Sequence, residues 1–95
     1  MDINDYQSQI RNFIDYPIEI GPFTVILDLQ KNVGNLSEKL NKSLTTDHGS
    51  FSKEDKIKIA ISLGDILYNV TNMASDLGLT MNDVVSINLT KHTSK

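Results

Sequence analysis

Apolar residues recur along this 95-residue chain at steps of three and four, and this spacing constrains the fold more than any other feature. The longest series is Ile26, Leu29, Val33, Leu36, Leu40 and Leu44. Such steps place side chains on one face of an α-helix, whereas a half-buried strand alternates with a period of two. No segment has the strand pattern. The sequence therefore predicts an all-α domain.

Proline and glycine place the first helix boundaries. The first predicted helix covers residues 3–14 and is ended by Asp15-Tyr16-Pro17, because a residue that precedes proline avoids the helical region. Gly21-Pro22 begins the second helix, since proline at the first helical position loses no needed N–H group. The polar segment 45–50 ends the second helix.

Capping residues place the remaining boundaries. Ser52 and Asp55 predict a capping box at the start of the third helix, and Gly78 is expected to close that helix in a left-handed conformation. Thr80 and Asp83 repeat the capping signature for a short fourth helix that ends near Lys91, and residues 92–95 are expected to fray. The predicted buried stripe of the third helix is Ile57, Ala60, Ile61, Gly64, Leu67, Val70, Met73, Ala74 and Leu77.

Composition limits the classes of function. The chain has no cysteine, which excludes disulfides and thiolate metal sites. Its net charge of −3, with acids and bases mixed along the sequence, argues against a general nucleic-acid partner. No basic-then-apolar start predicts a signal peptide, and no apolar run approaches the roughly 18 residues that predict a membrane span. We therefore expect no membrane partner and a cytoplasmic location, in the host if a bacteriophage encodes the chain.

The second and third predicted helices are apolar on more than one face. The residues outside a single stripe include Phe23, Val25, Ile26 and Leu27 on one helix and Ile57, Ile59, Ile61 and Ile66 on the other. A chain of this size buries only about 60–65% of its unfolded surface. The extra apolar face predicts a partner, and the first expectation is a homo-oligomer, either a dimer or a tetramer. The alternative is an internal core covered by the first and fourth helices.

Two segments carry motifs: residues 27–40, LDLQKNVGNLSEKL, and residues 61–68, ISLGDILY. They resemble the helical motifs of the MazG-like nucleotide pyrophosphohydrolases, which read G-E-x-G-E-L-x-E-K-L and E-L-G-D-V-L-W-Y. Further stretches similar to family features are Asp5-Tyr6-Gln7, Tyr16-Pro17, residues 77–84 and Asn88-Leu89-Thr90-Lys91. The resemblance spans nearly the whole chain. It implies a MazG-like four-helix bundle that is completed by homo-oligomerisation.

The departures from the family pattern fall at its metal-binding carboxylates. Asn32, Asn35 and Ser62 stand where the family has glutamate, and only Asp65 is retained. The family's four acids face two Mg²⁺ ions, and Mg²⁺ prefers anionic oxygen ligands. Metal-assisted hydrolysis needs those ions to activate water and to neutralise phosphate. The resemblance thus implies a fold that has lost its chemistry and has no catalytic residue and no cofactor.

Polar side chains form two stripes on these helices, with Asp28, Asn32, Asn35 and Lys39 on one, and Ser62, Asp65, Asn69, Asn72 and Asp76 on the other. Asparagine offers donors and acceptors that suit a base edge or a ribose, and Lys39 can meet phosphate oxygens. Tyr68 can stack on a base or belong to the core. The alternative is that the stripes are solvated surface.

The closing motif adds two residues by resemblance, since the family's N-L-x-K asparagine and lysine help to hold phosphates and metal. The predicted ligand-binding set is Asn32, Asn35, Lys39, Ser62, Asp65, Tyr68, Asn69, Asn88 and Lys91. Asp28 and Asp65 are weak candidates for a residual Mg²⁺ site. His48 and His92 have no partner at ligand spacing.

Three functions remain open at this point. The first is an inactive MazG-like protein that binds a nucleotide or a nucleotide-derived signalling molecule intact, by analogy a bacteriophage anti-defence sponge. The second is a residual Mg²⁺-dependent nucleoside triphosphate pyrophosphohydrolase. The third is a structural, protein-binding helical oligomer.

Overall fold

The computed structural model describes residues 1–46 and 48–94, and every regular element in this part of the chain is a helix. The α-helices are α1 (Ile3–Ile10), α2 (Gly21–Thr46), α3 (Lys53–Asp76) and α4 (Met81–Thr93). Two 3-10 turns, Arg11–Phe13 and Ile18–Ile20, lie between α1 and α2. The prediction of an all-α chain with four helices is confirmed.

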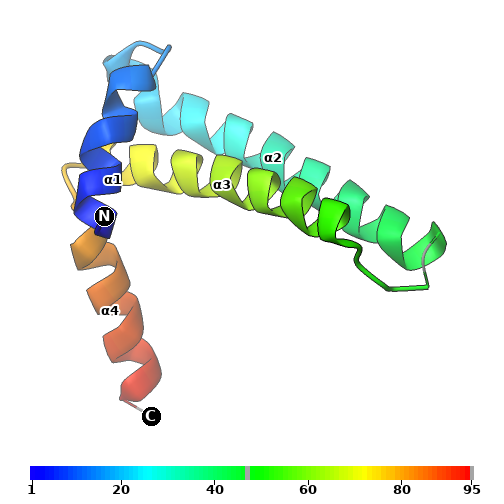
Figure 1. The fold of residues 1–95 in the computed structure, drawn as a ribbon. Helices are drawn as coiled ribbons and strands as arrows, with labels where there is room; N and C mark the ends of the chain where they lie inside the picture. Colours follow the sequence, from blue (N-terminus) through cyan, green and yellow to red (C-terminus); the bar gives the residue numbers. More distant parts are fainter. Residues whose placement is uncertain (47, 95) are drawn as a thin grey trace.

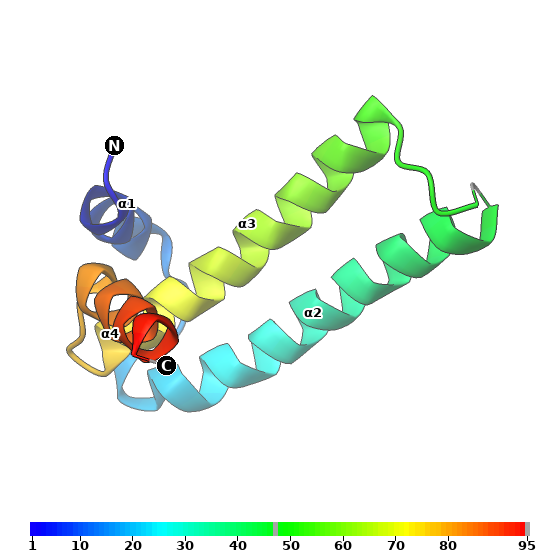
Figure 2. The same ribbon diagram turned by 90° about the horizontal axis from the view of Figure 1, so that it is seen from below.

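Helices α2 and α3 form a long antiparallel hairpin, and α1 and α4 lie at one end of it (Figure 1). We call this the closed end; it holds the α2 N-terminus and the α3 C-terminus. The opposite end, where α2 passes into α3, is the loop end. In the view of Figure 2 the two ribbons diverge from the closed end toward the loop end. The closed end is therefore built from all four helices, whereas the loop end is built from α2 and α3 alone.

The predicted caps set the helix boundaries. The Ser52 hydroxyl accepts from the Asp55 N–H at 3.0 Å, and the Asp55 carboxylate accepts from the Ser52 N–H at 3.2 Å, which completes the capping box. Helix α2 begins at Gly21, as predicted, and Gly78 has a φ of 74° just after α3. The C-terminal ends of the helices differ more from the predicted bounds than the N-terminal ends do. The first helix passes into a 3-10 turn after Ile10.

The predicted polar loop and frayed tail are shorter than expected. Helix α2 includes Thr45 and Thr46, whose hydroxyls donate to carbonyls of the preceding turn; Asp47 lies outside the described residues. Helix α4 continues to Thr93, where the expectation of fraying is wrong. The Thr93 hydroxyl donates to the Leu89 carbonyl at 3.0 Å and extends the last turn. Lys95 lies outside the described residues.

Side chains of α1 cap the N-terminus of α4, although the two helices lie far apart in the sequence. The Gln7 Oε1 accepts from the Met81 N–H at 2.8 Å, and the Asn4 Oδ1 accepts from the Asn82 N–H at 3.0 Å. The Thr80 hydroxyl accepts from the Asp83 N–H at 3.1 Å, as its capping signature predicts. These bonds satisfy N–H groups that a helix start leaves free. They fix α4 to the closed end, from which it projects away from the hairpin (Figure 1).

The hairpin turns its polar sides inward. The buried apolar side chains in the described part are Val25, Ala74 and Met81, whereas the buried polar ones are Ser43, Ser62, Asn69, Thr71 and Asn72. The predicted apolar stripe of α3 is therefore wrong over most of its length, with Ile57 55% and Ile61 60% exposed and Ala74 its one fully buried member. The physical reason is that polar side chains pair across the seam between α2 and α3, which leaves the apolar sides facing outward.

Candidate functional site

A buried ion pair closes the polar seam at the closed end. The Arg11 Nη2 donates to the Asp76 Oδ1 at 2.6 Å, and the Tyr16 hydroxyl donates to the Asp76 Oδ2 at 2.8 Å. The Asp76 side chain is 0% exposed. A Cβ added at Gly21 would overlap this carboxylate, so the start of α2 packs directly on it. The cluster joins the chain before α2 to the last turn of α3.

Ionisation in this cluster follows from burial and hydrogen bonding. Burial raises the pKa of Tyr16, and the hydrogen bond to Asp76 raises it further, although Arg11 acts in the opposite direction. Burial lowers the pKa of Arg11, but its hydrogen bonds to Asp76 and Tyr16 outweigh that effect, and the net pKa is raised. Both groups therefore keep their protons, and the cluster is a structural tie with no free base.

Asparagines pair the two stripes in the middle of the seam. The Asn32 Nδ2 donates to the Asn69 Oδ1 at 2.6 Å, and the Asn69 Nδ2 donates to the Asp28 Oδ2 at 2.7 Å. Asn69 is only 2% exposed. The interpretation of the α3 stripe as solvated surface is thus wrong for Ser62, Asn69 and Asn72, which are buried. Polar side chains of α2 bond Ser62 and Asn69, whereas Asn72 accepts from Arg11.

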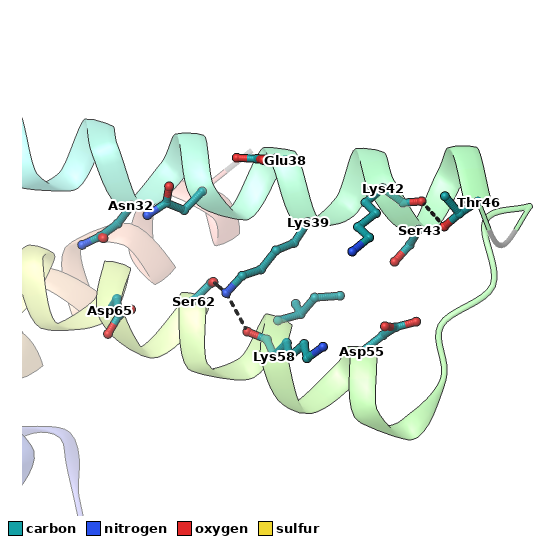
Figure 3. A pocket seen from close by; sticks show the side chains of 12 residues that line it. Asn32, Glu38, Lys39, Lys42, Ser43, Thr46, Asp55, Lys58, Ser62 and Asp65 are labelled. Carbon is teal, nitrogen blue, oxygen red and sulfur yellow. Dashed lines mark hydrogen bonds between the residues drawn. The ribbon is translucent and has the colours of Figure 1, made fainter.

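Beyond these asparagines the helices enclose a cleft of about 420 Å³, which we call the loop-end cleft (Figure 3). It is lined by Asn32, Asn35, Glu38, Lys39, Lys42, Ser43 and Thr46 from α2, and by Asp55, Lys58, Ile59, Ser62 and Asp65 from α3. Figure 3 shows the Lys39 side chain reaching across from α2 toward α3. Its Nζ donates to the Ser62 Oγ at 2.6 Å and to the Lys58 carbonyl at 3.4 Å.

This donor set does not fit the metal pair that the resemblance implies. Ser62, at a family glutamate position, accepts from the Lys39 ammonium group, and Asn32 donates its amide to Asn69. An ammonium group at that point repels a divalent cation. The candidate pair of Asp28 and Asp65 is divided between two cavities. Among residues 1–46 and 48–94, no group of three or more histidines, cysteines or acids is placed to hold a metal ion.

A second cavity of about 220 Å³ lies between the same helices nearer the closed end. It is lined by Asp15, Tyr16, Thr24, Val25, Asp28, Tyr68, Asn69 and Asn72. We call it the closed-end cavity. Asn32 lines the loop-end cleft and Asn69 lines this cavity, so the hydrogen bond between them joins a wall of one space to a wall of the other.

Tyr68 is held in place at this second cavity. Its hydroxyl donates to the Phe13 carbonyl at 3.1 Å, which ties α3 to the segment after α1. Burial raises the pKa of Tyr6 on α1, and electrostatic interaction with Tyr68 and Asp65 raises it further. Tyr68 therefore serves the packing of the closed end and also forms part of the cavity wall, and its stacking on a base stays a prediction.

Most of the predicted ligand residues lie along the seam. Five of them line the loop-end cleft: Asn32, Asn35, Lys39, Ser62 and Asp65. Tyr68 and Asn69 line the closed-end cavity. Asn88 and Lys91 are exposed on α4 and line neither space in this single chain. The structure thus brings the two stripes together and leaves the closing motif apart.

The cleft also contains residues outside the predicted ligand-binding set, chiefly Glu38, Lys42, Asp55 and Lys58. A signal for them exists in the same helical steps. Lys42 and Thr46 follow Lys39 at positions i+3 and i+7, and Lys58 and Asp55 precede Ser62 at i−4 and i−7. The stripes continue toward the loop end past the segments in which the family motifs occur.

Comparisons with protein-family models, curated proteins and solved structures gave no match to this chain. The resemblance to the MazG-like family therefore rests on the motifs quoted above. In the described part of the chain, no helix combines the length and the apolar character that crossing a membrane requires.

Proposed function

We propose that this chain binds a nucleotide, or a nucleotide-derived signalling molecule, in the loop-end cleft and leaves it intact. The observation that carries the proposal is the placement of Lys39, whose ammonium group is held on Ser62 inside a cleft of about 420 Å³. Lys42 and Lys58 line the same cleft. Lysines bind phosphate oxygens as point charges, and the amides of Asn32 and Asn35 supply the donors and acceptors that a sugar or base edge requires.

The same geometry favours binding over hydrolysis. A two-metal hydrolase neutralises phosphate with divalent ions held by several acids. Here lysine ammonium groups supply the positive charge, and Glu38, Asp55 and Asp65 balance it. Binding is then independent of Mg²⁺. Intact retention of a nucleotide signal fits the anti-defence sponge that the bacteriophage analogy implies.

The outward faces of the hairpin favour a second candidate function, a helical homo-oligomer that binds other proteins. Only three apolar side chains of the described part are buried. The large apolar residues that are at least half exposed on the hairpin are Phe23, Leu27, Leu44, Ile57, Ile61 and Leu63. Burial of apolar surface is the main favourable term in folding, so we propose that a second copy of this chain covers these faces.

The proposed oligomer interface and the proposed ligand site can be tested separately, with one substitution on each surface. Ile61→Asp places a charge on the outward face, and Asn35→Leu alters the cleft. Light scattering coupled to size-exclusion chromatography is expected to show dissociation for Ile61→Asp and the wild-type mass for Asn35→Leu. A wild-type protein that elutes as a monomer at all concentrations would overturn the oligomer.

Retention and recovery of nucleotides test the proposed binding. The purified protein is incubated with nucleoside triphosphates and cyclic signalling nucleotides, with Mg²⁺ or with EDTA, and then removed by filtration. We expect one nucleotide to be depleted stoichiometrically in both conditions and to be released unchanged when the retained protein is heated. Recovery as monophosphate and pyrophosphate, in the Mg²⁺ arm only, would instead establish the residual hydrolase. Depletion of no nucleotide would leave the helical oligomer as the better account.

A further inference from the structure

The side-chain amide of Asn72 is incompletely satisfied. Asn72 lies on α3, is 1% exposed and lines the closed-end cavity. Its Oδ1 accepts a long hydrogen bond of 3.4 Å from the Arg11 Nη1, while its Nδ2 has no hydrogen-bond partner. A buried donor without a partner is costly, and natural proteins rarely retain one without a reason. The cavity that Asn72 lines is the nearest place for a missing acceptor.

The closed-end cavity contains other groups that can bind a polar ligand. The Asp28 carboxylate lines it and accepts one hydrogen bond from Asn69, at 2.7 Å, so it has lone pairs left. The hydroxyl-bearing rings of Tyr16 and Tyr68 line the same cavity. Aromatic rings offer a flat apolar surface beside these polar atoms.

The charge of this cavity differs from that of the loop-end cleft. Its lining includes two acids, Asp15 and Asp28, and no lysine or arginine, whereas the cleft is lined by three lysines and three acids. Phosphate is therefore disfavoured in the closed-end cavity. A neutral group with both donors and acceptors is favoured, because it can donate to Asp28 and accept from Asn72.

We propose that the closed-end cavity is a second subsite, which takes the edge of a nucleobase through Asn72 Nδ2 and the Asp28 carboxylate. This assignment rests on the proposed nucleotide binding, and it divides the ligand between two spaces. The phosphates lie in the loop-end cleft with Lys39. The base lies beyond the Asn32–Asn69 hydrogen bond, in the cavity of about 220 Å³.

Two fragment probes separate the subsites in the full-length protein. Adenosine, guanosine, cytidine and uridine carry a base without phosphate, and tripolyphosphate carries phosphate without a base. Binding is measured by titration calorimetry and by the shift in Tm. We expect one nucleoside to bind wild type, to lose at least about tenfold in affinity in Asn72→Leu, and to bind Lys39→Gln normally. Tripolyphosphate is expected to bind Asn72→Leu normally and to lose affinity in Lys39→Gln.

The Tm of Asn72→Leu without ligand distinguishes a binding role of Asn72 from a purely structural one, because loss of a structural asparagine would lower the Tm. Leucine has a similar size and removes the donor that lacks a partner, so Asn72→Leu is expected to melt no lower than wild type. If this variant does not fold, the second subsite is tested instead in wild type, through the side-chain amide signals of asparagine in a nitrogen–proton NMR spectrum. Those of Asn72 are expected to shift with the nucleoside, and those of the exposed Asn41 are not.

The outcomes distinguish this proposal from the proposed function. Tripolyphosphate binding through Lys39 with no binding of any nucleoside would overturn the second subsite and leave the nucleotide cleft standing. Nucleoside binding that Asn72→Leu does not weaken would also overturn the subsite. Absence of binding by both probes would overturn both proposals.

Discussion

The two ends of the hairpin use polar residues differently. At the closed end most of them are satisfied by one another, the Asn72 Nδ2 excepted: Arg11 and Tyr16 bond Asp76, and Gln7 bonds Ser75 and the Met81 N–H on the two sides of the α3–α4 junction. At the loop end, Lys39 makes the side-chain bonds from α2 to α3, and the other polar groups line an open cleft. The closed end therefore stabilises the hairpin. The loop end keeps polar groups on the surface of the cleft, where we propose that a ligand binds.

This difference shows where stability and function can be separated. Residues with complete hydrogen bonding contribute to folding, whereas polar groups that line an open cleft keep donors and acceptors available for the ligand that we propose. Helix α3 belongs to both ends of the hairpin, since its C-terminal half lies at the closed end and its N-terminal half lines the cleft. Substitutions at the two ends should affect different measurements.

The largest effect is expected from Arg11→Leu. It leaves the buried Asp76 carboxylate without its cation, and loss of one partner of a buried pair costs about 3–5 kcal/mol. Urea unfolding at fixed protein concentration should show this loss. The matched control is Lys58→Ala, which breaks an exposed pair with Glu54 and should cost less than about 1 kcal/mol. Equal losses in the two variants would contradict the special role of the closed end.

Gly21→Ala is expected to have the next largest effect. The added methyl group overlaps the Asp76 carboxylate, which cannot move away because Arg11 and Tyr16 hold it. Overpacking of this kind costs about 1–3 kcal/mol. Gly64→Ala is the control, since a Cβ there meets nothing within 4 Å, and alanine in a helix interior should stabilise by about 0.5–1 kcal/mol. A loss of stability in Gly64→Ala would show that its face is covered in the assembly.

Lys39→Gln should lower ligand affinity more than stability. Loss of a charge-assisted bond to phosphate is expected to weaken nucleotide binding about tenfold or more, as measured by titration calorimetry. The change in unfolding free energy should be small, because Lys39 lies on an open cleft. Lys56→Gln removes the same charge from an exposed position that lines neither the cleft nor the closed-end cavity, and it should leave affinity unchanged. Equal weakening in both variants would indicate general electrostatic attraction only.

The smallest predicted effect concerns pH. Burial and the hydrogen bond to Asp76 raise the pKa of Tyr16 above its ordinary value of 10.0, so folding favours the neutral phenol. The resulting stabilisation is fully present below that value and is lost as the pH rises through the folded pKa. The urea midpoint of wild type should therefore fall in this alkaline window, and less steeply for Tyr16→Phe. Parallel curves for the two proteins would contradict the assigned shift.

The sequence predicts the helices well because helix signals are local. The Ser52–Asp55 capping box and the Gly21-Pro22 start involve neighbouring residues, and both are confirmed. The face of α3 that meets α2 was not predictable in the same way. Periodicity identifies an apolar side, but pairing between Asn32 and Asn69 or Lys39 and Ser62 joins residues far apart in sequence and turns the polar side inward.

The candidate site shows the same limit. The two polar stripes could be found from helical spacing, and the motifs drew attention to Asn32, Asn35 and Ser62. The incomplete bonding of Asn72 and the separation of Asn88 and Lys91 from the cavities depend on tertiary packing. The direction of α4 is set by Gln7 and Asn4 of α1, which no local pattern indicates.

Hydrogen–deuterium exchange of the full-length protein, with and without the nucleotide that it retains, tests the division between the two ends most directly. Without ligand, amides of α2 and α3 near the closed end should exchange slowly and those near the loop end faster. Addition of the nucleotide should protect the segments that line the cleft, residues 32–46 and 55–65, and also residues 68–72, which line the closed-end cavity. Uniform exchange along the hairpin, or protection confined to α4, would contradict the account.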